Sequence, residues 1–229
     1  RCGISHTAPL AVLQEKLTLA IRKGRPVHFL PPYRADNKLK LSRWLGICPE
    51  AIADRISIEL AIAIVSLRDK KSDEEIREIE DACEIGYRMH TTAMKMCCPG
   101  ARERDIAGAI EGIALEMGEG VSFHSIVTQH GETLHNHGHD GILESGRMLL
   151  VDAGAENLMN YCSDFTRSYP VNGRFTPMQR DIYEIVLAAN AHAFEMAKPG
   201  LLYKEVHLAC VKVILEGLKS LGLVRGDMD

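Results

Sequence analysis

An internal repeat is the feature that most limits how this chain can fold. The segment KMCCPGARERDIAGAIEGIALEM aligns without a gap with EMAKPGLLYKEVHLACVKVILEG, at an offset of 100 residues. Apolar residues recur at helical spacing on both sides of each Pro-Gly pair. A Pro-Gly turn between helices is common, but it does not explain the matched flanks. The repeat therefore predicts two helices joined by a Pro-Gly turn, present twice.

The starts of the two helix pairs carry capping signals. Ser72 followed by Glu75 has the pattern of a capping box, and this first helix is expected to end before Pro99. The second pair opens with Thr176-Pro-Met-Gln179, which adds a proline at the first helical position.

A β-rich region lies between the two helix pairs. The segments 123–129, 147–153 and 161–171 are separated by Gly, Asn and Asp residues and predict strands. The first copy of the repeat is thus predicted to contain two helices followed by a sheet, and the second copy to contain two helices. The counterpart of the sheet is expected at about residues 221–270, so the fold is expected to be incomplete at its C-terminus.

The region before the repeat has a different character. We expect helices over residues 10–23 and 35–45, with an apolar run at residues 27–30 between them. The charged stretch from Asp69 to Ser72 marks a boundary, so residues 1–69 and 70–229 are expected to be separate domains.

Composition excludes several classes of function. The 27 basic and 31 acidic residues give a net charge of −4, which provides no electrostatic surface for nucleic acid or an anionic membrane. The most apolar stretch, residues 58–67, is too short to cross a bilayer and contains Glu59. Seven scattered cysteines without a Cys-x-x-Cys pair argue against a disulfide scaffold or a zinc knuckle. They indicate a reducing compartment, and the cytoplasm is the expected location.

Two aspartates follow or occupy the predicted strands. Asp152 ends the apolar run MLLV, and Asp164 lies in the segment YCSDFTR. A single aspartate after a strand is commonly a turn former, but a hairpin can place two carboxylates side by side. Two such carboxylates repel unless a cation lies between them, and hard oxygen ligands suit Mn²⁺ or another first-row ion.

Histidines alternate in the segment TLHNHGHD. His135, His137 and His139 share one face if this segment is extended, which would suit a metal or substrate site. The alternative, which we favour for His137 and His139, is an exposed polar loop in which only His135 is held at a strand end. His130 is expected to lie in a turn, and His124 to be a core residue or a residue behind the site.

The residues around the two aspartates resemble a known family. The runs LVDAGAE (150–156), SDFTR (163–167) and PVNGRFTP (170–177) closely resemble the pita-bread metallopeptidases, above all the Xaa-Pro aminopeptidases and prolidases. The resemblance implies an α+β pita-bread fold, incomplete at its C-terminus. It also implies that residues 1–69 are the C-terminal part of a smaller α/β domain, and that residues 70–229 begin the catalytic domain.

The resemblance implies roles for three residues. Asp152 and Asp164 would be the first two ligands of a centre of two divalent metal ions, Mn²⁺ foremost, with Co²⁺ or Zn²⁺ as alternatives. The family's other ligands, a histidine and two glutamates, match no segment here. His135, 17 residues before Asp152, would be the catalytic histidine that contacts the substrate. The two aspartates are 12 residues apart, one more than is usual in the family, and the hairpin turn at residues 157–160 is expected to hold the extra residue.

The activity implied by the resemblance is release of the N-terminal residue from peptides with proline in second position, through a hydroxide that bridges the metals. A prolidase, a creatinase-like C–N hydrolase and a non-catalytic peptide- or protein-binding module remain alternatives. Because ligands are lacking, the 229-residue chain alone is expected to be inactive. The sequence neither requires nor excludes a homo-oligomer.

Overall fold

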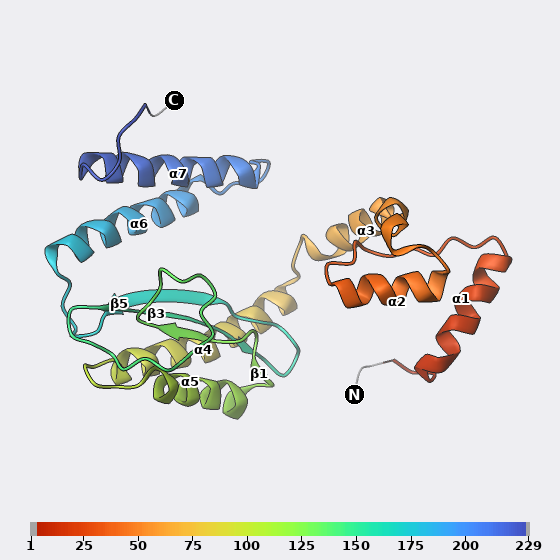
Figure 1. Cartoon of the computed structure of the whole chain (residues 1–229), viewed down its shortest axis with the longest axis horizontal. Coiled ribbons are helices and arrows are strands. Elements are labelled where there is room, and N and C mark those ends of the chain that lie inside the picture. The colour runs from red at the N-terminus through yellow and green to blue at the C-terminus, as the bar shows by residue number, and fades with distance from the viewer. Residues whose placement is uncertain (1–3, 228–229) are drawn as a thin grey trace. The chain divides into compact units, whose positions relative to one another are not determined.

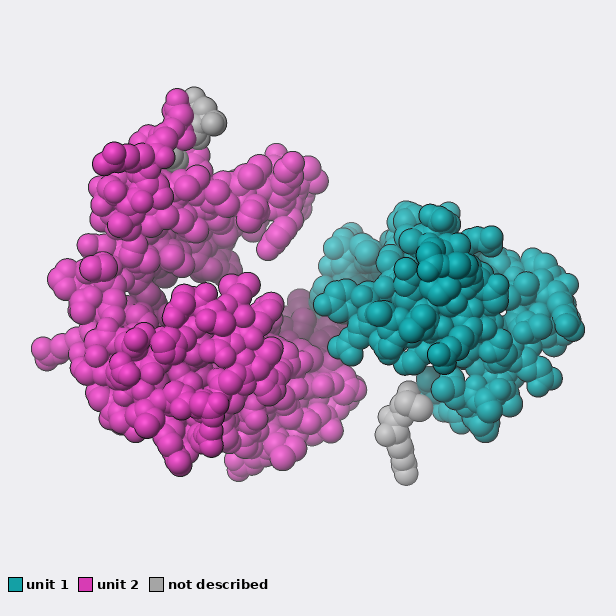
Figure 2. Space-filling view, in the orientation of Figure 1, with its two compact units in different colours: residues 1–73 teal, residues 74–229 magenta. Residues whose placement is uncertain are grey.

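The computed structural model describes residues 4–227 and divides into two compact units, residues 1–73 and 74–229 (Figure 2). This division lies close to the expected boundary after residue 69. Cys2 lies outside the described residues, and the other six cysteines have free thiols. No helix within residues 4–227 is both long and apolar enough to span a membrane.

Within its described residues, the regular elements of the first unit are all helices, joined by irregular segments. The expected helices are present as α1 (Leu13–Arg22) and α2 (Ala35–Leu45), and a third helix, α3 (Ile58–Arg68), follows. Short 3-10 helices precede α1 and α3, at Leu10–Val12, Pro49–Ala51 and Ala53–Arg55. Ser57 caps α3, because its hydroxyl accepts a hydrogen bond from the Leu60 amide at 3.1 Å.

The second unit has four long helices, which lie on both sides of a small set of strands (Figure 1). In chain order the elements are α4 (Asp73–Met96), α5 (Glu103–Met117), β1 (Gly120–Val121), β2 (Ile126–Thr128), β3 (Met148–Ala153), β4 (Ala155–Glu156), β5 (Phe165–Pro170), α6 (Pro177–Met196) and α7 (Tyr203–Ser220).

The main sheet is antiparallel and has the strand order β2-β3-β5. Strands β1 and β4 form a second, two-stranded antiparallel ladder. The three predicted β segments thus each contain a strand, although β2 and β5 are shorter than their segments. The small β1–β4 ladder was not predicted, because two-residue strands leave no periodic signal.

Burial alternates along β3 and defines the two faces of the sheet. Leu149, Val151 and Ala153 are fully buried, whereas Met148, Leu150 and Asp152 are half-buried. The buried face packs on α4 and α5, and this contact forms the hydrophobic core. The core side chains contributed by the two helices are Ile85, Met89, Ala93, Ile106, Ala107, Ile110 and Ala114.

The structure confirms the duplicated helix pair. The first helices of the two pairs end at Met96 and Met196, and the second helices begin at Glu103 and Tyr203. The turn glycines match as well, since Gly100 and Gly200 have φ values of +88° and +91°. The predicted capping box is also present at α6, where the Thr176 hydroxyl accepts from the Gln179 amide. The copies differ in burial, because Ala189 is the single buried residue of α6 and α7 has none.

Leu149 gives a direct test of the core. Truncation to alanine removes a fully buried side chain between β3 and the helices, and we expect it to lower the free energy of unfolding by about 2–5 kcal/mol. The matched control is Leu115→Ala on the outer side of α5, where the side chain is 71% exposed and a change within about 0.5 kcal/mol is expected. Urea unfolding measures both, and equal losses would contradict this assignment of the core.

Candidate metal and substrate site

The register of the β3–β5 hairpin places Asp152 and Asp164 on one face of the sheet. Asp152 pairs with Thr166, so these two side chains point to the same side. Asp164 precedes Thr166 by two residues and therefore points the same way. For such a diagonal pair the Cβ atoms are about 7–8 Å apart or slightly closer.

The hairpin keeps a single register from Met148 paired with Pro170 to the bridge between Glu156 and Cys162. Its turn is closed at Asn157, whose amide donates to the Tyr161 carbonyl at 2.9 Å. Asn160 adopts the left-handed conformation (φ +64°) that a tight loop of this length requires. Residues 157–161 thus form the turn, and the single register keeps both aspartates on one face.

Gly154 allows the two strands to approach closely beside the aspartates. In the common register it lies opposite Asp164, and a Cβ atom there would be 1.9 Å from the Ser163 carbonyl oxygen and 2.6 Å from the Ser122 hydroxyl. Any side chain at position 154 would therefore push the strand that carries Asp164 away from β3.

Asp152 has one carboxylate oxygen without a protein partner. Its side chain is half-buried, and the Oδ1 atom is shielded from solvent yet accepts no hydrogen bond within the described chain. A buried carboxylate oxygen without a donor is costly unless a cation or another group satisfies it. Asp164 is exposed on the same face.

His135 and Asp152 line the same hollow. This hollow has a volume of about 250 Å³ and opens on the sheet face opposite the core. Its wall also includes Thr128, Leu150 and Thr166, which belong to the three strands of the sheet. A larger hollow of about 790 Å³ adjoins it, shares Leu150 and Thr166, and extends to α6. The structure thus brings together two of the three predicted site residues, and the third lies on the same sheet face.

The loop that carries the histidines is not the extended segment that alternation requires. His135 has φ +51° and lies in an exposed turn instead of at a strand end, so the segment is not an extended strand. The rings of His135 and His137 nevertheless lie nearly parallel, with centroids 6.4 Å apart. His137 is exposed, as expected, and its ring packs edge-on against that of His124 with centroids 4.6 Å apart. His124 itself is exposed and is therefore not a core residue.

His139 differs from the expectation of a purely exposed loop. It is half-buried, its Nδ1 atom lies 3.4 Å from the Val127 carbonyl oxygen, and its Nε2 atom is buried without a partner in the described chain. His130 occupies a turn, as expected, since its carbonyl accepts from the Thr133 amide and its ring pairs with Glu132.

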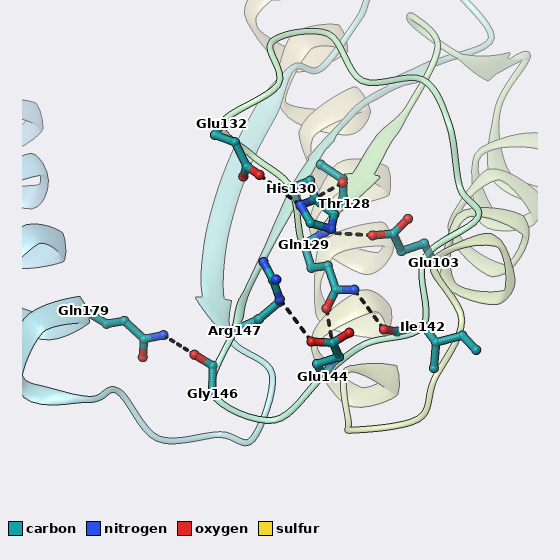
Figure 3. Close-up of polar contacts among 10 residues, drawn as sticks. All are labelled: Glu103, Thr128, Gln129, His130, Glu132, Ile142, Glu144, Gly146, Arg147 and Gln179. Atoms are coloured by element: carbon teal, nitrogen blue, oxygen red, sulfur yellow. Dashed lines mark hydrogen bonds and ion pairs between the residues drawn. The ribbon is translucent and has the colours of Figure 1, made fainter.

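Glu103 is a site-associated residue that the sequence analysis missed. It is 3% exposed, and its carboxylate accepts a hydrogen bond from the Gln129 amide at 2.8 Å (Figure 3). The same carboxylate accepts a second hydrogen bond from the Gly141 amide at 3.0 Å. Gln129 and Gly141 are the two ends of the loop that carries His135. A signal did exist, because Glu103 occupies the apolar stripe of α5 with Ile106, Ala107, Ile110 and Ala114.

His90 lies on the core side of the hairpin, behind the aspartates. Its Nε2 atom is 3.2 Å from the carbonyl oxygen of Ala153, the residue after Asp152, and its ring meets Phe165 edge-on. Burial lowers the pKa of His90, which favours a neutral ring that donates from Nε2.

The two aspartates fit a divalent cation as part of a ligand set. Their oxygen donors suit Mn²⁺ and similar ions, and the unsatisfied Oδ1 of Asp152 is a donor atom available to one. Within residues 4–227, no group of three or more His, Cys, Asp or Glu side chains is arranged to hold a metal ion.

Comparison with known sequences identifies the family. The model of metallopeptidase family M24 matches residues 77–226. The chain is 39% identical over 171 residues to a probable Xaa-Pro aminopeptidase of Botryotinia fuckeliana, and 36% identical over 162 residues to the Xaa-Pro aminopeptidase of Escherichia coli. These alignments cover 73% and 69% of this chain, but 37% and 36% of the relatives. The aligned part of the chain thus spans little more than a third of the length of these relatives.

Comparison with solved structures supports the same family. The aminopeptidase PepP of Pseudomonas aeruginosa superposes with a TM-score of 0.77 at 31% identity, over 97% of this chain and 52% of that one. The proline aminopeptidase P II of Yersinia pestis gives a TM-score of 0.77 at 29% identity, over 98% of this chain and 53% of that one. The fold is therefore the α+β pita-bread fold of the metallopeptidases, as the sequence resemblance implied. The chain belongs to metallopeptidase family M24.

Proposed function

We propose that the full-length protein is a metal-dependent aminopeptidase that releases the first residue of peptides whose second residue is proline. The observation that carries this proposal is the hollow shared by His135 and Asp152, with Asp164 on the same sheet face. The relatives named Xaa-Pro aminopeptidase support this choice of substrate over a prolidase or a binding module.

Asp152 and Asp164 would hold two divalent ions, with Mn²⁺ as the first candidate and Co²⁺ or Zn²⁺ as alternatives. When bound, such ions activate a water molecule for attack and polarise the carbonyl of the scissile bond. The aspartates contribute fixed negative charge and geometry, not proton transfer. Gly154 supports this role, because it lets the strand of Asp164 lie against β3.

His135 would donate a hydrogen bond to the substrate carbonyl or to the tetrahedral intermediate. The bond before proline is a tertiary amide without an N–H group, so an enzyme for it cannot use that hydrogen as a binding contact. A donor directed at the carbonyl oxygen is available from His135, whose exposed ring lies at the wall of the hollow. The half-buried Leu150 and the neighbouring Thr166 give that wall both apolar and polar character.

An assay with three peptides tests the proposal. After treatment with a chelator, the full-length protein is given Mn²⁺, Co²⁺ or Zn²⁺ and an Xaa-Pro-Xaa tripeptide, with an Xaa-Pro dipeptide and an Xaa-Ala-Xaa tripeptide for comparison. We expect metal-dependent release of the first residue from the proline tripeptide, and much slower cleavage of the alanine peptide. Cleavage of the dipeptide alone would identify a prolidase, and peptide binding without cleavage under any metal would identify a binding module.

A further inference from the structure

We propose that Glu103 is a positioning residue: it ties together the two ends of the loop 129–141 and so holds His135 at the hollow that contains Asp152. The role assigned to His135 rests on the proposed function, whereas the fixing of the loop by Glu103 stands on geometry alone. Figure 3 shows Glu103 beside Gln129 where the loop leaves β2.

One buried carboxylate serves both ends of this loop. Oε1 of Glu103 accepts from the Gln129 amide at 2.8 Å, and Oε2 accepts from the Gly141 amide at 3.0 Å. The return bond is also present, since the Glu103 amide donates to the Gly141 carbonyl at 3.0 Å. The charge lies at the first residue of α5, where the helix dipole favours an anion.

The Glu103 carboxylate makes a connection to the loop that the main-chain hydrogen bonds do not make. The far end of the loop is already held to the start of α5 by main-chain bonds, from Leu143 to the Ala101 carbonyl and from Gly100 to the Leu143 carbonyl. The near end of the loop is Gln129. Among the hydrogen bonds of the described residues, only the one from the Gln129 amide to the Glu103 side chain links this end to α5. The Gln129 side chain adds a second link between the two ends, because it donates to the Ile142 carbonyl at 2.8 Å.

The fixed end leads directly to His135. Gln129 follows Thr128, a residue that is 1% exposed and whose hydroxyl accepts from the Asn136 side chain at 3.2 Å. Asn136 is the residue next to His135. Fixing Gln129 thus fixes the end of β2, which anchors the loop beside His135. His135 has φ +51°, a conformation that requires support from its surroundings.

The first experiment measures the loop without reference to activity. In Glu103→Gln the side chain keeps its size but offers one oxygen, so its NH₂ group opposes either the Gln129 or the Gly141 amide. We expect peptides spanning residues 127–142 of the full-length protein to exchange hydrogen about tenfold faster or more. The control Glu116→Gln changes an exposed glutamate of the same helix and should leave exchange unchanged. Mn²⁺ affinity should stay within about twofold of the unmodified protein for both variants, because neither touches the aspartates.

A second variant tests the same contact from the loop side. In Gly141→Ala the new Cβ atom would lie 2.6 Å from the Glu103 carboxyl carbon, so the carboxylate must move away from the loop. Its matched control is Gly138→Ala in the same loop, where the nearest atom would be the Asn136 side-chain oxygen at 3.4 Å. We expect faster loop exchange in Gly141→Ala only. This pair decides the question if Glu103→Gln fails to fold.

A double-variant cycle tests whether Glu103 acts through His135. We expect Glu103→Gln to lower kcat for the proline tripeptide by about 10- to 100-fold, because a small displacement of the histidine has a large effect. In the His135→Ala background the same change should alter kcat by less than about twofold.

The outcomes separate the two proposals. Unchanged loop exchange in both Glu103→Gln and Gly141→Ala overturns the role of Glu103, whatever the activity. Losses of kcat that multiply in the double variant overturn its action through His135. An unmodified protein that cleaves no proline peptide overturns the proposed function, while the exchange experiment still decides whether Glu103 fixes the loop.

Discussion

Replacing Asp164 with alanine is expected to abolish both metal binding and peptidase activity of the full-length protein. Asp164 and Asp152 share one sheet face, so loss of either carboxylate removes half of the ligand charge on that face. Loss of a residue that merely supports a ligand weakens metal binding about 10- to 100-fold, and loss of a ligand should exceed this. Metal content after gel filtration measures the effect directly.

Stability provides a second measurement of the same change. Without metal, two carboxylates on one face repel each other, so Asp164→Ala should leave the melting temperature of the metal-free protein unchanged or raise it. Addition of Mn²⁺ should raise the melting temperature of the unmodified protein but not that of the variant, because only the former binds the ion. The control Asp181→Ala changes an exposed aspartate of α6 and should behave like the unmodified protein. Normal metal content in Asp164→Ala would refute the assignment.

Replacing His135 with alanine is expected to lower turnover by about 10²–10³-fold while metal content stays normal. The imidazole lines the same hollow as Asp152 but is not placed among the metal ligands, so its loss should affect kcat much more than metal binding. Stopped assays with the proline tripeptide at saturating Mn²⁺ measure kcat, and metal analysis of the same samples measures binding.

The neighbouring histidines are the natural controls for His135. His137→Ala should lower turnover no more than a few-fold, since its exposed ring packs against His124 and does not line the hollow. His139→Ala removes a half-buried ring beside the Val127 carbonyl, so we expect a loss of stability more than of turnover. A loss at His137 as large as that at His135 would show that the loop acts as one catalytic unit.

Much of the framework could be predicted from the sequence because its signals are local. The Pro-Gly turns, the cap at Thr176 and the helical spacing of apolar residues depend on contacts within a few positions. The face shared by Asp152 and Asp164 also follows from a local rule, because a hairpin with one register fixes it. Two-residue strands and the ends of helices leave weaker patterns in the sequence. The two-residue strands β1 and β4 were therefore not predicted.

The tertiary structure alone decided how the loop of His135 is held. Glu103 and Gln129 are 26 positions apart, and Glu103 and Gly141 are 38 apart, so no periodicity in the sequence links them. The alternating histidines suggested a strand, but the loop is curved and His135 takes a left-handed conformation. The sequence thus determined which residues lie on the long helices of the repeat and on the three strands of the main sheet, because backbone hydrogen bonds and side-chain periodicity act at short range. Packing of distant elements decided which side chains meet, because a buried charge such as Glu103 must find its donors wherever the fold supplies them.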